Sequence, residues 1–159
     1  MLGTVARMHA GLWESPELHR QPWLADPTVN PRIRHRMYLE ARHVFLERHA
    51  ELLTGGAGAY VRWNDRHGGQ LGRRLHKEAP STVIHGDLRL DNIFFDTGDP
   101  NDPVILADWQ LVGRGSAAYD VAYLISGTLD ASAPASVETE LLRGYHAALC
   151  REGVTGYPF

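Results

Sequence analysis

The chain has 159 residues, the size of one ordinary domain, and it can bury a real hydrophobic core. Hydrophobic residues make up 43% and charged residues 22%, which excludes a disordered or fibrous chain, and the net charge of −3 argues against an extended nucleic-acid surface. Cys150 is the only cysteine, so the sequence also excludes an internal disulfide framework and a cysteine-rich zinc site.

Neither a targeting segment nor a membrane span is apparent. The N-terminus, MLGTVARMHAGLWES, lacks the basic stretch followed by an unbroken apolar one that a secretory signal requires. No apolar run approaches the roughly eighteen residues of a membrane span. We therefore expect a cytoplasmic protein that has neither a membrane nor a nucleic acid as its partner.

Three helices are expected in the first half of the chain. Apolar residues recur at helical spacing over Leu2–Trp13. A Pro-containing loop follows, and Asn30-Pro31 then begins a long amphipathic helix that ends at Thr54-Gly-Gly. A third helical stretch runs from Ala57 to about His76, and the pair Gly68-Gly69 is expected to kink or split it.

Short strands are expected after Pro80, followed by two more helices. The strand segments are Thr82–His85, Ile93–Phe95 and Val104–Ala107. Turn-forming residues over Asp96–Pro103 join the last two strands into a hairpin. Helical patterns then cover Ala117–Leu129 and Val137–Glu152.

The segment TVIHGDLRLDNIFF places strongly polar residues between two apolar runs. His85 precedes Asp87 by two residues, and Asn92 follows Asp87 by five. After the next hairpin, Asp108 ends an apolar run. This joint spacing matches the kinase catalytic loop, in which an Asp faces the acceptor hydroxyl while an Asn and a later Asp bind magnesium.

The chemistry of phosphoryl transfer accounts for these residue types. A carboxylate must face the acceptor hydroxyl, and Asp87 fits this role. Mg²⁺ prefers hard oxygen ligands and keeps several of its waters, so it needs only a few protein groups besides the phosphates. Asn92 and Asp108 fit that role, and short strands on either side give both residues rigid anchors.

Several segments together resemble the phosphotransferases related to aminoglycoside phosphotransferase and choline kinase. The loop follows their HGD-x-x-x-x-N pattern. The closer resemblance is to the ecdysteroid-kinase-like branch, through LRLDN after HGD, the triplet Asp108-Trp109-Gln110, GSAAYDVAYLISGTL, the opening VARMHAGLW and the late LLRGYHAALCREGV. It extends over most of the chain and is strongest from Val83 to Leu129.

The resemblance implies a role for each matching residue. Asp87 is then the catalytic aspartate, Asn92 and Asp108 are the magnesium ligands that also bind the nucleotide, and His85 supports the loop. Asp120 is the helix-borne carboxylate that ties the loop's backbone together. For His85 and Asp120 a structural role, as a satisfied buried His and a loop-bracing Asp, is equally open.

Two further residues receive expectations. Arg89 lies two residues after Asp87, where protein kinases place a lysine near the transferred phosphate, so we expect an electrostatic role there, with a solvated surface position as the alternative. Trp109 stands where protein kinases have the phenylalanine of Asp-Phe-Gly. It is expected to support Asp108 structurally.

The expected fold class is α+β, a mainly helical protein-kinase-like C-terminal lobe with short β-hairpins at the catalytic loop. Residues 1–159 are expected to form one domain truncated at both ends, without the N-terminal lobe. That lobe carries a glycine-containing loop and a strand lysine for ATP. Lys77 is the only lysine and has no such strand around it, and the glycines near Thr54 lack the G-x-G-x-x-G order.

The function expected from these features is ATP- and Mg²⁺-dependent phosphorylation of a small hydroxylated molecule. The isolated chain is expected to be incomplete and to bind Mg·ATP weakly or not at all. One alternative is a truncated or degenerate kinase-like domain without activity of its own, serving as a binding or interaction module. A two-metal phosphoesterase is disfavoured because the Asp-x-His and Gly-Asn-His signatures of such sites are absent. The sequence leaves the identity of the acceptor open.

Overall fold

The computed structural model describes residues 1–24, 31–96, 98, 104–130 and 132–159, the side chains of 31–34, 72, 73 and 75–77 excepted. The chain folds as two compact units, one formed by Met1–Pro27 with Pro80–Phe159 and the other by Thr28–Ala79. Helices combined with small antiparallel sheets agree with the expected α+β class. None of the described helices combines the length and apolar character needed to cross a membrane.

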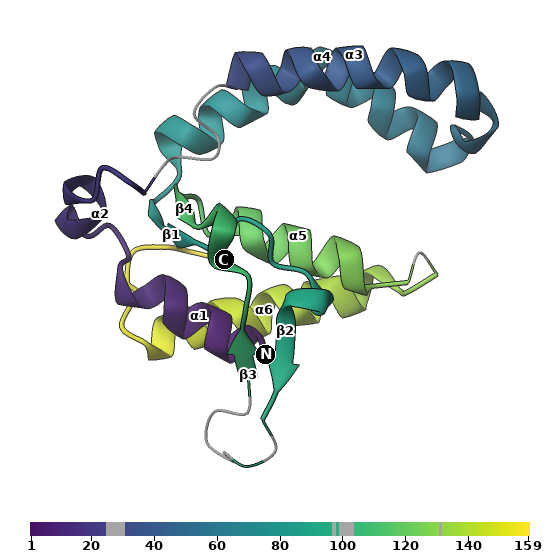
Figure 1. Ribbon diagram of the computed structural model, residues 1–159. Coiled ribbons are helices and arrows are strands. Elements are labelled where there is room, and N and C mark those ends of the chain that lie inside the picture. The colour runs from purple at the N-terminus through teal and green to yellow at the C-terminus, as the bar shows by residue number, and fades with distance from the viewer. Residues whose placement is uncertain (25–30, 97, 99–103, 131) are drawn as a thin grey trace. The chain divides into compact units, whose positions relative to one another are not determined.

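The first unit has a helical core (Figure 1). Its helices are α1 (Leu2–Gly11), α2 (Pro16–Arg20), α5 (Ala118–Thr128) and α6 (Ala135–Arg151). Helix α1 packs along α6, and one contiguous apolar cluster joins both helices to α5. The fully buried members of this cluster come from all three helices and from the 85–92 loop, and include Val5, Leu88, Leu124 and Leu149.

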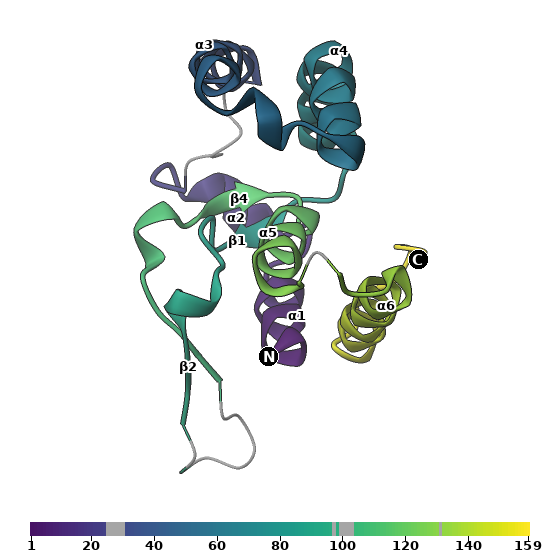
Figure 2. The same ribbon diagram turned by 90° about the vertical axis from the view of Figure 1, so that its right-hand side faces the viewer.

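Two small antiparallel ladders flank the 85–92 loop. In one, β1 (Thr82–Ile84) pairs with β4 (Gly113–Gly115). In the other, β2 (Ile93–Phe95) pairs with β3 (Val104–Leu106), and this hairpin extends beyond the helices in Figures 1 and 2. Short 3₁₀ turns precede β2 and follow β3, at Leu90–Asn92 and Trp109–Leu111.

The second unit is a hairpin of two long helices, seen side by side in Figures 1 and 2. Helix α3 (Pro31–His49) continues through a 3₁₀ turn at Ala50–Leu52 and is followed by α4 (Gly55–Glu78). Asp65 links the two helices, because it pairs with Arg42 at 2.6 Å and accepts a hydrogen bond of 3.1 Å from the Tyr38 hydroxyl.

The expected split at Gly68-Gly69 is not found, since α4 is one continuous helix. A Cβ atom on Gly68 would lie 2.3 Å from Oδ1 of Asn64, and one on Gly69 would lie 3.4 Å from the ring of His35 on α3. Gly68 therefore makes room for the Asn64 side chain, whereas a Cβ on Gly69 would make an ordinary contact with His35, and the helix continues past both glycines.

Two short elements were not expected from the sequence. Helix α2 lies in the segment interpreted as a Pro-containing loop, and it starts with Pro16 after Ser15, whose hydroxyl accepts a hydrogen bond of 3.2 Å from Glu17 N. Strand β4 is made of Gly-Arg-Gly, which has no strand pattern. Asn30 and most of the Asp96–Pro103 turn lie outside the described residues.

Candidate active site

The candidate site lies where the 85–92 loop meets the end of β3. The backbone N–H of Ala107 donates to the backbone oxygen of Asn92 at 2.9 Å, just beyond the β2–β3 ladder. Nε2 of His85 is 2.8 Å from the backbone oxygen of Ala107. These two contacts hold Asp108, the residue after Ala107, beside the loop that carries Asp87 and Asn92.

Asp87 and Asn92 are joined directly. The side-chain Nδ2 of Asn92 donates to the backbone oxygen of Asp87 at 2.9 Å and to its carboxylate Oδ2 at 3.3 Å. The N–H of Arg89 donates to the same backbone oxygen at 3.0 Å. Both Asp87 and Asn92 are half-buried. The lone pairs of an amide lie on its oxygen, so with Nδ2 directed to Asp87, Oδ1 of Asn92 is the atom that a metal ion would bind.

Asp108 adopts a left-handed backbone conformation, with φ of 63° and ψ of 64°. A non-glycine residue in this region carries strain, and such strain gathers at functional sites. Its carboxylate is exposed and accepts a hydrogen bond of 3.3 Å from Nε2 of Gln110. The conformation turns the chain sharply between β3 and the following 3₁₀ turn.

His85 is fully buried under Trp109. Their ring centres lie 4.7 Å apart at 49°, and the indole Nε1 of Trp109 donates to the backbone oxygen of Leu106 at 2.8 Å. On the other side of the imidazole, the N–H of Asp87 reaches Nδ1 at 3.4 Å. This network assigns the proton to Nε2, which faces a carbonyl, and the acceptor role to Nδ1.

Asp120, in the first turn of α5, binds the backbone of the loop. Its buried carboxylate accepts hydrogen bonds from His85 N at 2.6 Å and from Gly86 N at 3.0 Å. Gly86 has a φ of 85°, and a Cβ atom there would lie 2.2 Å from the backbone oxygen of Leu111. The loop therefore needs glycine at this position and a carboxylate at position 120.

A buried chain of hydrogen bonds extends from Asp120 to two residues that the sequence did not single out. Nε2 of His9, on α1, is 3.2 Å from Oδ2 of Asp120, and Nδ1 of His9 is 2.6 Å from the hydroxyl of Tyr145 on α6. Burial raises the pKa of Tyr145 well above its ordinary value, so the hydroxyl stays protonated and donates a hydrogen bond to Nδ1 of His9. His9 in turn donates to Asp120.

The signal for His9 was present in the sequence but was ambiguous. His9 occupies a core-facing position of the first amphipathic helix, where the helical spacing of the sequence groups it with the apolar residues. A polar group at such a position requires a partner, and the partners lie 111 and 136 residues away in the sequence. Helical periodicity gives no information about contacts at that separation.

Arg89 pairs with an acidic residue of its own loop. Its exposed guanidinium pairs with Asp91, and this hydrogen bond and charge raise the pKa of Arg89, with smaller contributions from Asp87 and Tyr123. Asp87 also interacts with Tyr123, on α5. The Asp87 carboxylate raises the pKa of Tyr123, first through a hydrogen bond to its hydroxyl and then through its charge.

The structure thus brings most of the sequence-predicted residues into one place. Contacts link His85, Asp87, Asn92, Trp109 and Asp120, and they fix the backbone on either side of Asp108. Arg89 is on the same loop. No group of three His, Cys, Asp or Glu side chains that could hold a metal ion is found within the described residues. The candidate ligand pair, one amide oxygen and one carboxylate, depends on phosphate oxygens and water to complete a Mg²⁺ shell.

Comparison with known proteins adds independent information. No curated protein and no solved structure matches the chain at a significant level. The sequence profile of the phosphotransferase enzyme family, however, matches residues 1–158. That match includes the 85–92 loop, the strands around it and all three helices of the buried hydrogen-bond chain, and the chain therefore belongs to the phosphotransferase enzyme family.

Proposed function

We propose that the chain transfers the γ-phosphate of ATP to a hydroxyl group of a small molecule. The observation that carries this proposal is the direct link between the Asp87 carboxylate and the Asn92 side chain, on a loop that is bonded to the residue before Asp108. Family membership supports a phosphotransferase. The segments LRLDN and GSAAYDVAYLISGTL favour the ecdysteroid-kinase-like branch and a C-terminal kinase lobe.

Asp87 is the residue that meets the acceptor hydroxyl. Its carboxylate is half-buried, and Asn92 and Tyr123 hold it in position. A carboxylate held in this way can orient the alcohol in line with the phosphorus and accept its proton as the new P–O bond forms and the bond to ADP breaks. His85 and Asp120 fix the backbone on which Asp87 depends.

The donor atoms fit Mg²⁺. Oδ1 of Asn92 and the carboxylate of Asp108 are hard oxygen ligands at the ends of paired strands, and the ion tolerates water in its other positions. When bound, ATP would supply the phosphoryl group and Mg²⁺ would neutralise the charge on its oxygens. Because the chain contributes two such side chains, metal binding should require the nucleotide.

The first test is a transfer assay. We would incubate the chain with a panel of small alcohols and a high concentration of Mg·ATP, because a C-terminal lobe alone is expected to bind the nucleotide weakly, and follow new phosphate monoesters by ³¹P NMR. Asp87→Asn should lower the rate by about 100-fold or more, the usual contribution of a positioned general base, with nucleotide binding unchanged. Asp91→Asn, an exposed carboxylate on the same loop, is the matched control and should retain activity. Equal loss in both variants would contradict the role of Asp87.

The second test locates the metal without needing turnover. Mn²⁺ with ADP should broaden the NMR signals of Asn92 and Asp108 before those of the rest of the chain. Asp108→Ala should remove this effect, whereas Asp91→Asn should not. Broadening centred on other residues would refute the ligand pair, even if phosphoryl transfer itself were observed.

A further inference from the structure

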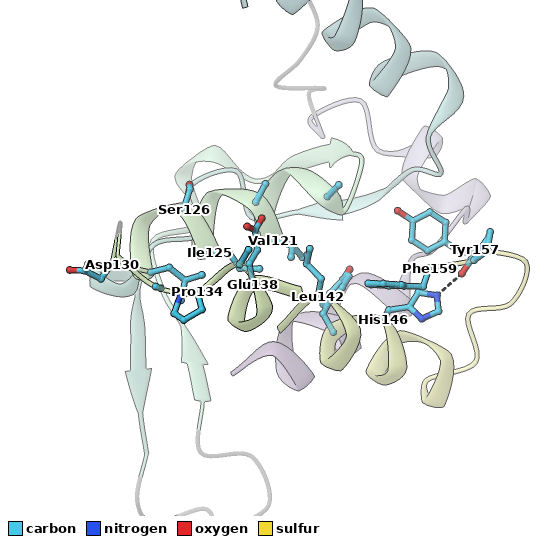
Figure 3. A pocket seen from close by; sticks show the side chains of 17 residues that line it. Val121, Ile125, Ser126, Asp130, Pro134, Glu138, Leu142, His146, Tyr157 and Phe159 are labelled. Atoms are coloured by element: carbon cyan, nitrogen blue, oxygen red, sulfur yellow. Dashed lines mark hydrogen bonds between the residues drawn. The ribbon is translucent and has the colours of Figure 1, made fainter. Parts of the chain in front are cut away.

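A pocket of about 650 Å³ opens between α5 and α6 (Figure 3). Its floor is made of apolar side chains from the two facing helices, among them Val121, Ile125 and Leu142. The C-terminal segment crosses one end of it and supplies the rings of Tyr157 and Phe159. Small-molecule sites in proteins have this size and this mainly apolar lining.

The pocket is separate from the candidate active site. Its lining comes from α5, α6, the 129–135 connection and residues 157–159, and it includes no residue between 82 and 116. On α5 the lining positions alternate with Asp120 and Tyr123, which contact the active-site loop and do not line the pocket. A ligand in the pocket would therefore bind behind α5 as seen from Asp87.

The charges of the lining favour a cation. Glu138 and Asp130 line the pocket, and among the described residues no lysine or arginine does so. Oδ1 of Asp130 already accepts hydrogen bonds from the N–H and the hydroxyl of Ser132 at 2.8 and 2.5 Å, so Glu138 is the carboxylate expected to pair with a bound cation. Nε2 of His146 is 2.6 Å from the backbone oxygen of Tyr157, so this nitrogen is engaged in a hydrogen bond within the chain and is not the group proposed to bind the ligand. Aromatic rings bind cations at their faces, but one face of the Phe159 ring already contacts the guanidinium of Arg143, from outside the lining, at 5.5 Å from the ring centre, so Tyr157 is the lining ring proposed for the ammonium.

One lining residue also belongs to the buried hydrogen-bond chain. Tyr145 lines the pocket, is 6% exposed, and its hydroxyl lies 2.6 Å from Nδ1 of His9. From His9 the chain reaches Asp120 at 3.2 Å, and from Asp120 the backbone of His85 and Gly86 at 2.6 and 3.0 Å. A ligand that presses on the Tyr145 ring can thus change the order of the catalytic loop through three linked side chains.

We propose that the pocket binds a small amphipathic amine, an apolar ring system with one protonated nitrogen, and that its binding is transmitted to the 85–92 loop through Tyr145, His9 and Asp120. This site is distinct from the acceptor site at Asp87. It gives the chain a second ligand and a means by which that ligand influences the first site.

The binding test compares three probes that share one ring, 1-naphthylmethylamine, 1-naphthalenemethanol and 1-naphthoate, by titration calorimetry and NMR. The amine should bind best. Glu138→Gln should lower the affinity for the amine, and for no other probe, by about two- to fivefold, the effect of one exposed ion pair. Glu140→Gln on the same helix should leave all three affinities unchanged. Ala122→Trp or Ser126→Phe, at exposed lining positions, should fill the pocket and abolish binding of all three. Equal affinity for the carboxylate, or binding that survives both fillings, would overturn the assignment.

The coupling test follows the backbone amides of His85 and Gly86 by hydrogen exchange. With saturating amine their exchange should slow by about fivefold or more, the usual range of coupling between two sites. Tyr145→Phe keeps the ring and removes the hydroxyl, so the amine should still bind while the effect on the amides disappears. If the amine binds and these amides do not respond in the unmodified chain, the transmission part of the proposal is wrong. This readout needs no enzymatic activity.

Discussion

Replacing Gly86 by alanine should destabilise the chain more than the same replacement at Gly153 or Gly144. The backbone at Gly86 has a φ of 85°, which costs a residue with a side chain about 1–2 kcal/mol. The new Cβ would also lie 2.2 Å from the backbone oxygen and 3.1 Å from the Cβ of Leu111. Since neither the oxygen nor the main chain is flexible, relief of the contact adds about 1–3 kcal/mol, as in overpacked cores.

The expected loss is therefore about 2–5 kcal/mol in the free energy of unfolding, a large share of the 5–15 kcal/mol typical of a domain. Urea denaturation followed by circular dichroism measures it. Gly153→Ala, with a φ of 96° and open space, isolates the conformational strain and should cost about 1–2 kcal/mol. Gly144→Ala, in open space within α6, should stabilise by about 0.5–1 kcal/mol. If Gly86→Ala costs no more than Gly153→Ala, the contact with Leu111 does not constrain the loop.

Three other predictions follow from the contacts of charged groups. Asp120→Ala removes the acceptor of two loop amides and of the His9 imidazole, and it should cost about 3–5 kcal/mol in urea denaturation, since it leaves three buried donors without an acceptor. Asp87→Asn should lower the pKa of Tyr123 toward its ordinary value, as measured by NMR titration of that ring, and an unchanged pKa would place the two groups further apart. The Ser132 hydroxyl and N–H hold the pKa of Asp130 below its usual value, so this carboxylate stabilises the fold at neutral pH and ceases to do so as the pH falls through the folded-state pKa. Ser132→Ala should raise that pKa in the same kind of titration, and a pKa that stays low would exclude the hydroxyl as its cause.

Much of the arrangement of the candidate site could be predicted because its residues are close to one another in the sequence. Asp87 and Asn92 are five residues apart on one loop, and the two apolar runs beside them form strands with the expected pairing partner for Ile93–Phe95. The order of strand, turn and strand then places Asp108 next to Asn92. A short antiparallel hairpin fixes such neighbours once its register is known.

The remaining features could not be predicted because they depend on contacts across the whole chain. His9 and Tyr145 acquire their roles from the packing of α1 against α6, and neither belongs to a short motif. The low helix propensity of glycine predicts an interruption at Gly68 and Gly69, yet α4 continues through both, and at Gly68 the Asn64 side chain occupies the space that a Cβ would need. Strand β4 consists of Gly-Arg-Gly and is a strand only because β1 lies beside it.

Because the Asp120 carboxylate binds the backbone of His85 and Gly86, the 85–92 loop should not keep its conformation outside this fold. Its conformation is specified by α5 directly and by α1 and α6 through two further side chains, so transplanting residues 82–96 into another scaffold would carry the reactive groups and leave behind what shapes them. Substitutions of the buried side chains between α1 and α6 should for the same reason disturb the candidate site.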